Sequence, residues 1–300
     1  MGKIYDYQGN IVSDGIGRGI EYNVRGVCHR GYNYSTCSSG TFVVNNSDGA
    51  PENTLPAYKL AAQKGFKYVE CDVAFTSDGE AVLLHDDTIN RTSNGTGAIA
   101  SLTLAQAQSY IYNKIKYSGV DETVPGYDSV TIPTFEDFIK LCKNLSLHPY
   151  IELKGGSSYT EAQIQGIVDM VDAAGMKGKV TYISFNPTYL GYVKDYDEEA
   201  RLGFVVFDVS SSPSPGLTQA NIDVAKALRT GKNDVFMDCR ARTDAACTLC
   251  INNEISLETW GIAVVTEDTE ANILALNPYF TGVTSNKYDA GKVLYDDAIE

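Results

Sequence analysis

Two carboxylates and one histidine lie close together in residues 68–86, on either side of an Asp78-Gly79 turn signal. Asp-Gly between two apolar runs favours a two-residue hairpin loop, which places Asp72 opposite His85. Glu70, two residues before Asp72, then points to the same side of the sheet. Because unpaired charge is costly to bury, this composition is typical of an active site rather than of a core hairpin.

A third carboxylate, Glu152, completes a set of candidate metal ligands. Glu70, Asp72 and Glu152 offer hard oxygen atoms with no Cys or His among them, and such a set suits Mg²⁺ or Ca²⁺ rather than zinc. The predicted cofactor is therefore one divalent cation, Mg²⁺ or Ca²⁺. Glu52 could serve as a fourth ligand, but a role supporting the other ligands is favoured. The alternative for any single acidic residue is a solvated surface group.

The chain has three histidines, and two of them, His29 and His85, fall beside these carboxylates. Imidazoles suit a general acid and a general base on opposite sides of a phosphorus centre. His148, at the opposite end of its strand, is interpreted as structural. The planar guanidinium of Arg30 and the compact ammonium of Lys154 are suited to bind phosphate oxygens. The alternative is that both cations form salt bridges with the same carboxylates. Together these groups predict a site that cleaves phosphodiesters.

The elements that must position these residues alternate between strands and helices after a lead-in at residues 1–23. Strands are predicted at residues 24–29, 68–73, 149–153, 179–184, 202–207, 234–238, 260–265 and 281–284. Helices are predicted at residues 51–64, 102–112, 135–144, 160–174, 187–197, 217–230, 241–253 and 268–276. Eight parallel strands with intervening helices close into an α/β fold, the (β/α)8 TIM barrel. We expect residues 24–300 to form this single domain, with an inserted segment at about 87–148 after the hairpin of the second strand.

The candidate residues fall at the carboxyl ends of the first three strands, where such barrels carry their chemistry. These strand-end residues are His29 and Arg30, then Glu70 and Asp72, then Glu152 and Lys154. Three successive strands therefore deliver charged side chains to one rim, which packing alone does not require. A long polar loop between Tyr32 and Ala50 follows the first strand, and loops of this length are usually functional or mobile.

The composition excludes some classes of protein and leaves others open. A net charge of −14 argues against broad attraction to nucleic acid or anionic lipid. No apolar run approaches the ~18 residues of a transmembrane span, and the first ten residues lack the apolar region of a signal peptide. Among the seven cysteines, Cys247 and Cys250 form one C-x-x-C pair with no second pair or nearby histidine, so a zinc site is disfavoured. The compartment and the oligomeric state stay undetermined.

The residues then resemble a known family, the glycerophosphodiester phosphodiesterases. The resemblance covers residues 24–285 and is carried by His29-Arg30-Gly31, Pro51-Glu52-Asn53-Thr54, Glu70-x-Asp72, His85-Asp86 with Arg91-Thr92, Ile132-Pro133-Thr134, Glu152-x-Lys154, Ser184-Phe185 and the strand around Trp260. It implies a phospholipase-C-like barrel in which Glu70, Asp72 and Glu152 bind the metal. It further implies that His29 and His85 act as acid and base, and that Arg30 and Lys154 contact the phosphate. It also implies supporting roles for Glu52, Asn53 and Asp86. Phe185 and Trp260 resemble the family's apolar wall beside the alcohol, although core packing explains either residue nearly as well.

The resemblance implies hydrolysis of a glycerophosphodiester to glycerol 3-phosphate and an alcohol. One alternative is an enzyme for a polymeric glycerophosphate, such as teichoic acid, or for an intact lipid, since the long loop carries Tyr32, Tyr34 and Phe42. Another is a barrel that binds glycerophosphate without cleaving it; such modules tend to lack a histidine or a ligand, and this chain retains them all. Where the family usually has a Thr-Asp pair, the last strand ends in Ser285-Asn286.

Overall fold

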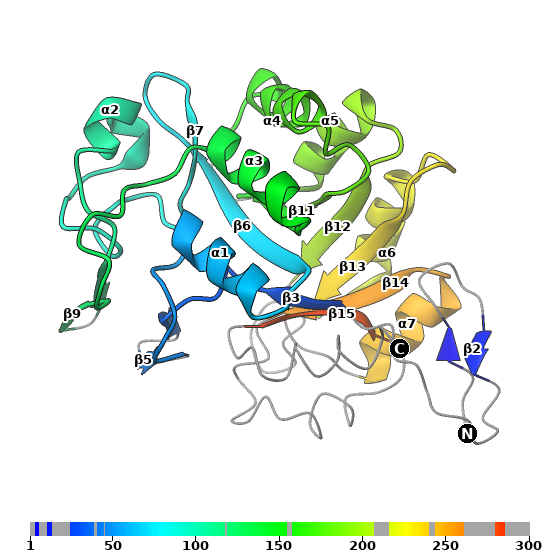
Figure 1. Cartoon of the computed structure of the whole chain (residues 1–300). Helices are drawn as coiled ribbons and strands as arrows, with labels where there is room; N and C mark the ends of the chain where they lie inside the picture. Colours follow the sequence, from blue (N-terminus) through cyan, green and yellow to red (C-terminus); the bar gives the residue numbers. More distant parts are fainter. Residues whose placement is uncertain are drawn as a thin grey trace.

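Eight parallel strands close into a barrel, which confirms the predicted fold class (Figure 1). The structure is a computed structural model that describes residues 4–5, 11–13, 25–38, 41–44, 46–117, 119–154, 158–206, 216–239, 244–260 and 280–285. The barrel strands are β3 (Arg25–Cys28), β6 (Tyr68–Phe75), β10 (His148–Leu153), β11 (Thr181–Ser184), β12 (Arg201–Val206), β13 (Val235–Cys239), β14 (Ser256–Trp260) and β15 (Phe280–Ser285). Each pairs in parallel with the next, and β15 pairs with β3 to close the ring.

The seventh strand lies earlier in the chain than the predicted 260–265. In the structure β14 ends at Trp260, and residues 261–265 lie outside the described part of the chain. The sequence of β14 is too polar to be recognised as a barrel strand. The reason is that its inward side chain, Glu258, is charged and is buried in an ion-pair network. Glu258 Oε1 accepts hydrogen bonds from Arg201 Nη2 at 2.6 Å and from Arg25 Nη1 at 3.1 Å. From sequence alone, a charged residue that is paired inside the barrel cannot be distinguished from a charged residue on the surface.

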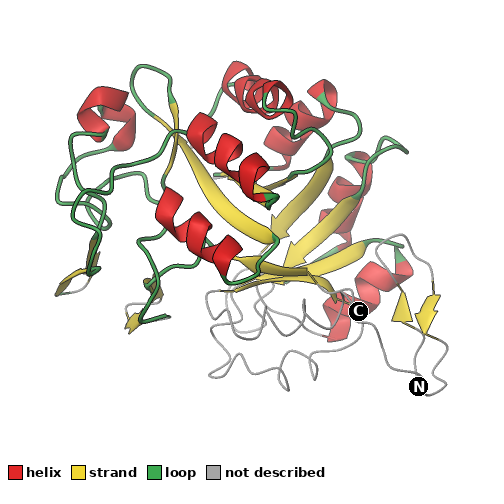
Figure 2. Ribbon diagram, in the orientation of Figure 1, coloured by secondary structure: helices red, strands yellow, loops and turns green. Residues whose placement is uncertain are grey.

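Helices cover the outside of the barrel (Figure 2). They are α1 (Leu55–Gln63), α3 (Phe135–Leu145), α4 (Glu161–Ala173), α5 (Pro187–Tyr196), α6 (Gln219–Ala227) and α7 (Asp244–Asn252). In α3 the buried residues Phe135, Phe138 and Ile139 follow helical spacing, and the Thr134 hydroxyl caps the first turn. The predicted helix 268–276 lies outside the described residues. Within those residues, no helix is both long and apolar enough to cross a bilayer.

The hairpin after β6 has a three-residue loop, so its predicted register is wrong by one residue. β7 (Ala81–Leu83) pairs with β6 such that Val73 lies opposite Leu83. Asp72 therefore faces Leu84, whose N–H donates to the Asp72 carbonyl at 3.0 Å, rather than His85. The cause is Gly79, whose φ of +86° accommodates the left-handed residue of a three-residue loop. His85 lies beyond the end of β7, and the ladder does not fix its position.

The segment between β7 and α3 forms a structure with its own small core, seen at the left of Figure 1. It contains a 3₁₀ turn (Ile99–Ser101), α2 (Leu104–Ala107) and the hairpin of β8 (Lys114–Tyr117) and β9 (Val120–Thr123). The predicted helix 102–112 is thus reduced to four residues. The core of this segment is formed by Ala74, Val82, Leu84, Ile89, Ile99, Ala107, Tyr112 and Ile132. α3 packs on α1 and α4 instead, as a helix of the barrel layer.

Two further hairpins lie near the N-terminus. The loop predicted between Tyr32 and Ala50 contains a hairpin of β4 (Ser35–Ser38) and β5 (Thr41–Val44), and β4 contacts β8. β1 (Ile4–Tyr5) and β2 (Ile11–Ser13) form a separate two-stranded sheet. The division into a lead-in and a single barrel domain stays a prediction, because residues 14–24 lie outside the described part of the chain.

Candidate active site

Three buried carboxylates form a compact cluster at the carboxyl end of the barrel. Glu70 and Asp72 lie on β6 and Glu152 on β10, with Glu152 directly beside Asp72 in the parallel register. One oxygen from each residue lies within 4.8 Å of the others. Alternate residues of a strand point to the same side, so Glu70 and Asp72 both face the barrel interior. The structure thus brings together the three residues predicted as metal ligands.

Packing three acids together changes their ionisation. Burial, reinforced by Asp72 and Glu152, raises the pKa of Glu70 well above its usual range. Burial also raises the pKa of Glu152. It acts on Asp72 in the same direction, but Lys154 and Arg30 overcome it and hold the Asp72 pKa well below its usual range. Burial and mutual repulsion therefore disfavour the state in which all three carboxylates are ionised.

The donor set fits a hard divalent cation. Glu70 Oε1 is buried and has no hydrogen-bond partner within the described residues, although buried polar atoms normally have one. Glu70 Oε2 accepts the backbone N–H of Arg30 at 2.9 Å. A cation among Glu70, Asp72 and Glu152 would bind the unpaired oxygen and offset the mutual repulsion. Oxygen-only ligation of this kind suits Mg²⁺ or Ca²⁺.

His29 reaches the cluster through a tight turn at the end of β3. Its Nε2 lies 3.8 Å from Glu70 Oε2. The next two residues, Arg30 and Gly31, adopt φ values of +56° and +76°. A Cβ on Gly31 would come within 2.8 Å of the Ala57 side chain, so only glycine fits there. The unusual backbone of Arg30 also points its N–H toward Glu70, an example of local strain at a candidate site.

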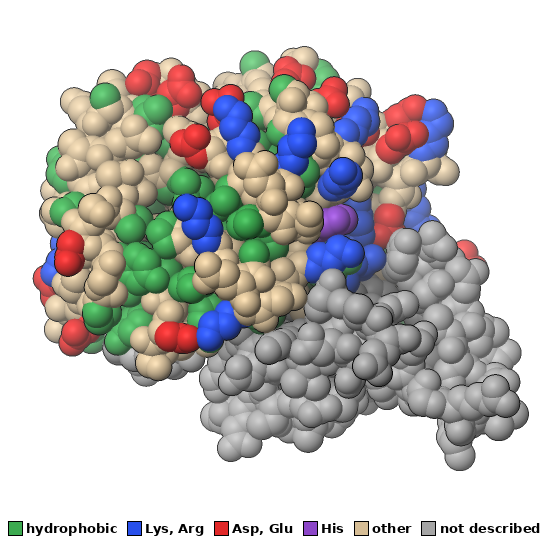
Figure 3. Space-filling model, viewed as in Figure 1, with side chains coloured by type: hydrophobic (Ala, Val, Ile, Leu, Met, Phe, Trp, Pro, Cys, Tyr) green, Lys and Arg blue, Asp and Glu red, His purple; other side chains and the backbone are tan. Residues whose placement is uncertain are grey.

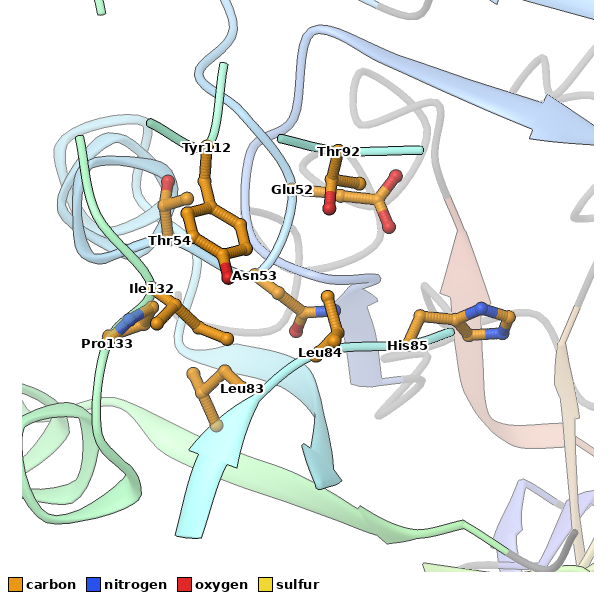
Figure 4. A pocket seen from close by; sticks show the side chains of 10 residues that line it. All are labelled: Glu52, Asn53, Thr54, Leu83, Leu84, His85, Thr92, Tyr112, Ile132 and Pro133. Atoms are coloured by element: carbon orange, nitrogen blue, oxygen red, sulfur yellow. The ribbon is translucent and has the colours of Figure 1, made fainter. Parts of the chain in front are cut away.

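His85 lies in the turn after β7, next to Asp86. Its ring points away from the apolar side chains of Leu83, Tyr112 and Ile132 (Figure 4). His85 Nδ1 lies 2.7 Å from Asp86 Oδ1. His85 lines the same cleft as Arg30, which contacts Asp72. The role of His85 in catalysis stays a prediction, and the predicted ladder pairing of His85 with Asp72 is wrong.

The two predicted phosphate ligands lie among the carboxylates. Arg30 Nε is 3.1 Å from Asp72 Oδ2, and Lys154 Nζ is 3.3 Å from Asp72 Oδ1 and 3.0 Å from Glu152 Oε1. Both cations therefore form the salt bridges that the sequence allowed as an alternative. The carboxylates raise the pKa of Lys154 despite its burial, so the ammonium stays charged. A phosphate entering the site would meet both cations beside the acidic cluster.

A surrounding layer of side chains holds these groups in place. Asn53 Nδ2 donates to Asp72 Oδ2 at 2.7 Å, and the Tyr58 hydroxyl donates to Asn53 Oδ1 at 2.9 Å. Glu52 accepts from Arg30 at 3.0 Å. Glu52 is therefore an ion-pair partner of Arg30, and it lies outside the set of candidate metal ligands.

Arg91 is a member of this layer that the sequence interpretation did not assign. It forms a two-pronged ion pair with Glu52, with both distances 2.7 Å. Its Nε and Nη2 also donate to Asp86, at 2.7 Å and 3.0 Å. Arg91 thus links Glu52 to Asp86, the partner of His85. In the sequence, the position of Arg91 shortly after His85-Asp86 is the feature that could have indicated this role.

Phe185 and Trp260 lie at the carboxyl ends of β11 and β14. Their rings meet edge to face, with centroids 5.5 Å apart. Both pack against the barrel-interior core that includes Val27 and Tyr150. They form an apolar surface at the rim that carries the charged residues, and their contact with substrate stays a prediction.

A cleft of about 490 Å³ opens beside the two groups Arg30 and His85. We call it the rim cleft. Its lining residues are Arg30, His85, Asp86, Thr88, Asn90, Arg91, Thr96 and Lys116. All except Arg30 come from the segment between β7 and β9, so this segment shapes the space above the candidate site.

Comparison with solved structures places this barrel in a class. A phosphodiesterase from Oleispira antarctica, solved in complex with the product sn-glycerol-3-phosphate, has a TM-score of 0.65 at 22% identity and covers 91% of this chain and 96% of its own. A putative glycerophosphoryl diester phosphodiesterase from Silicibacter pomeroyi has a TM-score of 0.69 at 15% identity, covering 92% and 95%. The chain therefore has the fold of the phosphodiesterase barrels.

Sequence comparison names the family. The profile of the Glycerophosphoryl diester phosphodiesterase family matches residues 29–242, and the chain belongs to that family. Human glycerophosphodiester phosphodiesterase 1 is 38% identical over 109 residues, which are 36% of this chain and 31% of the human protein. The chain spans about a third of the length of the mammalian relatives that it matches.

Proposed function

We propose that the chain is a phosphoric diester hydrolase that cleaves glycerophosphodiesters to glycerol 3-phosphate and an alcohol. One observation carries the proposal: His29 lies beside a buried cluster of three carboxylates, and His85 lines a cleft with Arg30, which contacts that cluster, in a chain of this family. The product bound in the Oleispira antarctica structure supports the same substrate class.

The cation would be held by Glu70, Asp72 and Glu152. When bound, it supplies positive charge for the negative charge that develops on the phosphoryl oxygens. Arg30 and Lys154 add fixed positive charge from the chain itself, and both are already positioned by contacts with Asp72. The substrate phosphate would exchange some of these ion pairs for its own oxygens.

The two histidines would move protons. Burial raises the pKa of Asp86, but hydrogen bonds from His85 and Arg91 outweigh it, so Asp86 is ionised. The Asp86 carboxylate accepts the Nδ1–H of His85, and Nε2 is left for the substrate. His29, beside Glu70, would serve as the complementary acid or base.

Three histidine variants test the proposal with glycerophosphocholine and glycerophosphoglycerol as substrates. We expect His29→Ala and His85→Ala to lower kcat by about 10²–10⁴-fold, the usual contribution of a general acid or base. His148→Ala is the matched control, because His148 lies at the other end of β10 against Tyr68. A chelator should abolish turnover, and either Mg²⁺ or Ca²⁺ should restore it. Full activity in either of the first two variants would remove that histidine from the mechanism.

A further inference from the structure

The rim cleft carries positive charge on an acidic protein. The chain has a net charge of −14, and on the face drawn in Figure 3 acidic and basic side chains are interspersed. The charged side chains that line the rim cleft are mostly basic: Arg30, Arg91 and Lys116 against Asp86. His85 adds a further positive charge whenever it is protonated. The lining of the rim cleft is therefore more basic than the chain as a whole.

Lys116 differs from the two arginines because no carboxylate neutralises it. Arg30 and Arg91 pair with Glu52 and further acids of the supporting layer. Within the described residues, Lys116 Nζ has no carboxylate within 4.0 Å, and it donates to the Ser93 carbonyl at 2.9 Å. The strand that carries it is fixed, since the Lys116 N–H donates to the Arg91 carbonyl at 2.8 Å. Lys116 thus presents a positioned ammonium to the rim cleft.

We propose that the rim cleft holds the leaving alcohol and that Lys116 binds a second phosphate group on it. This inference rests on the proposed function. A glycerophosphodiester with an uncharged alcohol has one anionic group, the scissile phosphate, for which Arg30 and Lys154 already provide cations. The surface formed by Phe185 and Trp260 is apolar and cannot neutralise another anion. Among the described residues that line the rim cleft, Lys116 is the cation without a carboxylate partner, and an additional phosphate would bind there.

The size of the rim cleft agrees with this assignment. Its volume of about 490 Å³ falls within the roughly 300–1,000 Å³ of ordinary ligand pockets. The space is therefore larger than a single phosphate requires. Two sources share the chemistry of a leaving alcohol that carries a second phosphodiester: a small soluble molecule such as bis(glycerophospho)glycerol, and the end of a poly(glycerol phosphate) chain.

The test compares glycerophosphoglycerol with bis(glycerophospho)glycerol, whose leaving alcohol differs by one added glycerophosphate. We expect the ratio of their kcat/KM values to favour the second substrate by about fivefold at low ionic strength, which is typical of one partly exposed ion pair. Lys116→Gln should bring that ratio close to one. Lys114→Gln is the matched control on the same strand, because Lys114 pairs with Asp121 and does not line the rim cleft. Poly(glycerol phosphate) of increasing length separates the sources, since only a polymer substrate should gain further with length.

Two results would overturn the inference. An equal loss of kcat/KM for both substrates in Lys116→Gln would assign Lys116 to the scissile phosphate or to folding. A wild-type ratio of one would show that the rim cleft ignores the second phosphate. Turnover of glycerophosphocholine and glycerophosphoglycerol by the wild type separates these failures from failure of the proposed function, which would leave neither substrate cleaved.

Discussion

Asn53 donates from its side-chain amide to Asp72 Oδ2 over 2.7 Å, while its own side-chain oxygen accepts from the Tyr58 hydroxyl. The same oxygen also accepts the backbone N–H of Asp72 at 3.2 Å. Asn53 adopts a φ of +53°, a conformation that asparagine tolerates better than most residues. One amide thus holds both the backbone and the carboxylate of a candidate metal ligand.

Replacing Asn53 should therefore weaken cation binding without removing a ligand. We expect Asn53→Ala to lower cation affinity by about 10–100-fold, the usual effect of losing a partner of a metal ligand. Tyr58→Phe removes the hydroxyl that donates to the Asn53 side-chain oxygen and to the Glu70 carbonyl but keeps the Asn53 bond to Asp72, so it should cost less. Titration calorimetry with Mg²⁺ and with Ca²⁺ measures both. Wild-type affinity in Asn53→Ala would show that Asp72 is held by Arg30 and Lys154 alone.

Cation binding should depend on pH because of Glu70. Burial and the adjacent carboxylates raise the Glu70 pKa, so in the metal-free protein Glu70 stays protonated at pH values above its ordinary pKa. The folded state then binds more protons than the unfolded state, and the free energy of unfolding falls as pH rises through this window. A cation requires the ionised form, so its affinity should rise over the same window with release of protons. Calorimetry in two buffers of different ionisation enthalpy checks this, and buffer-independent heats would contradict it.

Glu52 should make the protein sensitive to acid. Burial raises its pKa, but Arg91 and Arg30 dominate and bring the Glu52 pKa from 4.5 to about 2. A lowered pKa adds stability above pH 4.5 that is lost as pH falls toward 2, and the shift corresponds to about 3 kcal/mol. Urea unfolding of wild type and Glu52→Gln should therefore differ at pH 7 and converge near pH 2. Glu136→Gln, which breaks an exposed pair with Lys140, is the control and should cost at most about 0.5 kcal/mol.

Glu258 should matter for stability and not for chemistry. It is the shared partner of Arg25 and Arg201 inside the barrel. Removing one partner of a buried ion pair typically costs about 3–5 kcal/mol, since the remaining charges are left without compensation. We expect Glu258→Gln to lower the urea midpoint markedly while kcat and KM at a permissive temperature stay near wild type. A kinetic defect at full stability would place Glu258 in the site instead.

The candidate ligands could be predicted from sequence because each is located by the end of its own strand. Parallel strands end at one edge of a sheet, so Glu70, Asp72 and Glu152 had to meet once their strands were recognised. The register of the hairpin could not be predicted as safely, since Asp-Gly fits both a two-residue and a three-residue loop and the difference shifts every pair by one residue. His85 lies beyond the end of the ladder, so the shift in register does not decide its position, and it lines a cleft with Arg30.

Long-range ion pairs account for the other errors. Arg91 and Glu52 are 39 residues apart, and the sequence around either residue does not indicate that they are in contact. The strand β14 was misplaced for the same reason, because Glu258 finds its partners on β3 and β12. Apolar periodicity identifies packing partners well, whereas a buried charge is recognisable only when its distant counter-ion is known.

The segment between β7 and α3 packs Ile89, Ile99 and Tyr112 into an interior separate from that of the barrel. That interior is completed by Ala74 of β6 and Val82 of β7, so the segment is anchored on the strand that carries Glu70 and Asp72. The segment also carries Arg91, which joins Glu52 to Asp86. Exchanging residues 87–117 between relatives should therefore alter the lining of the rim cleft and the surroundings of His85 together.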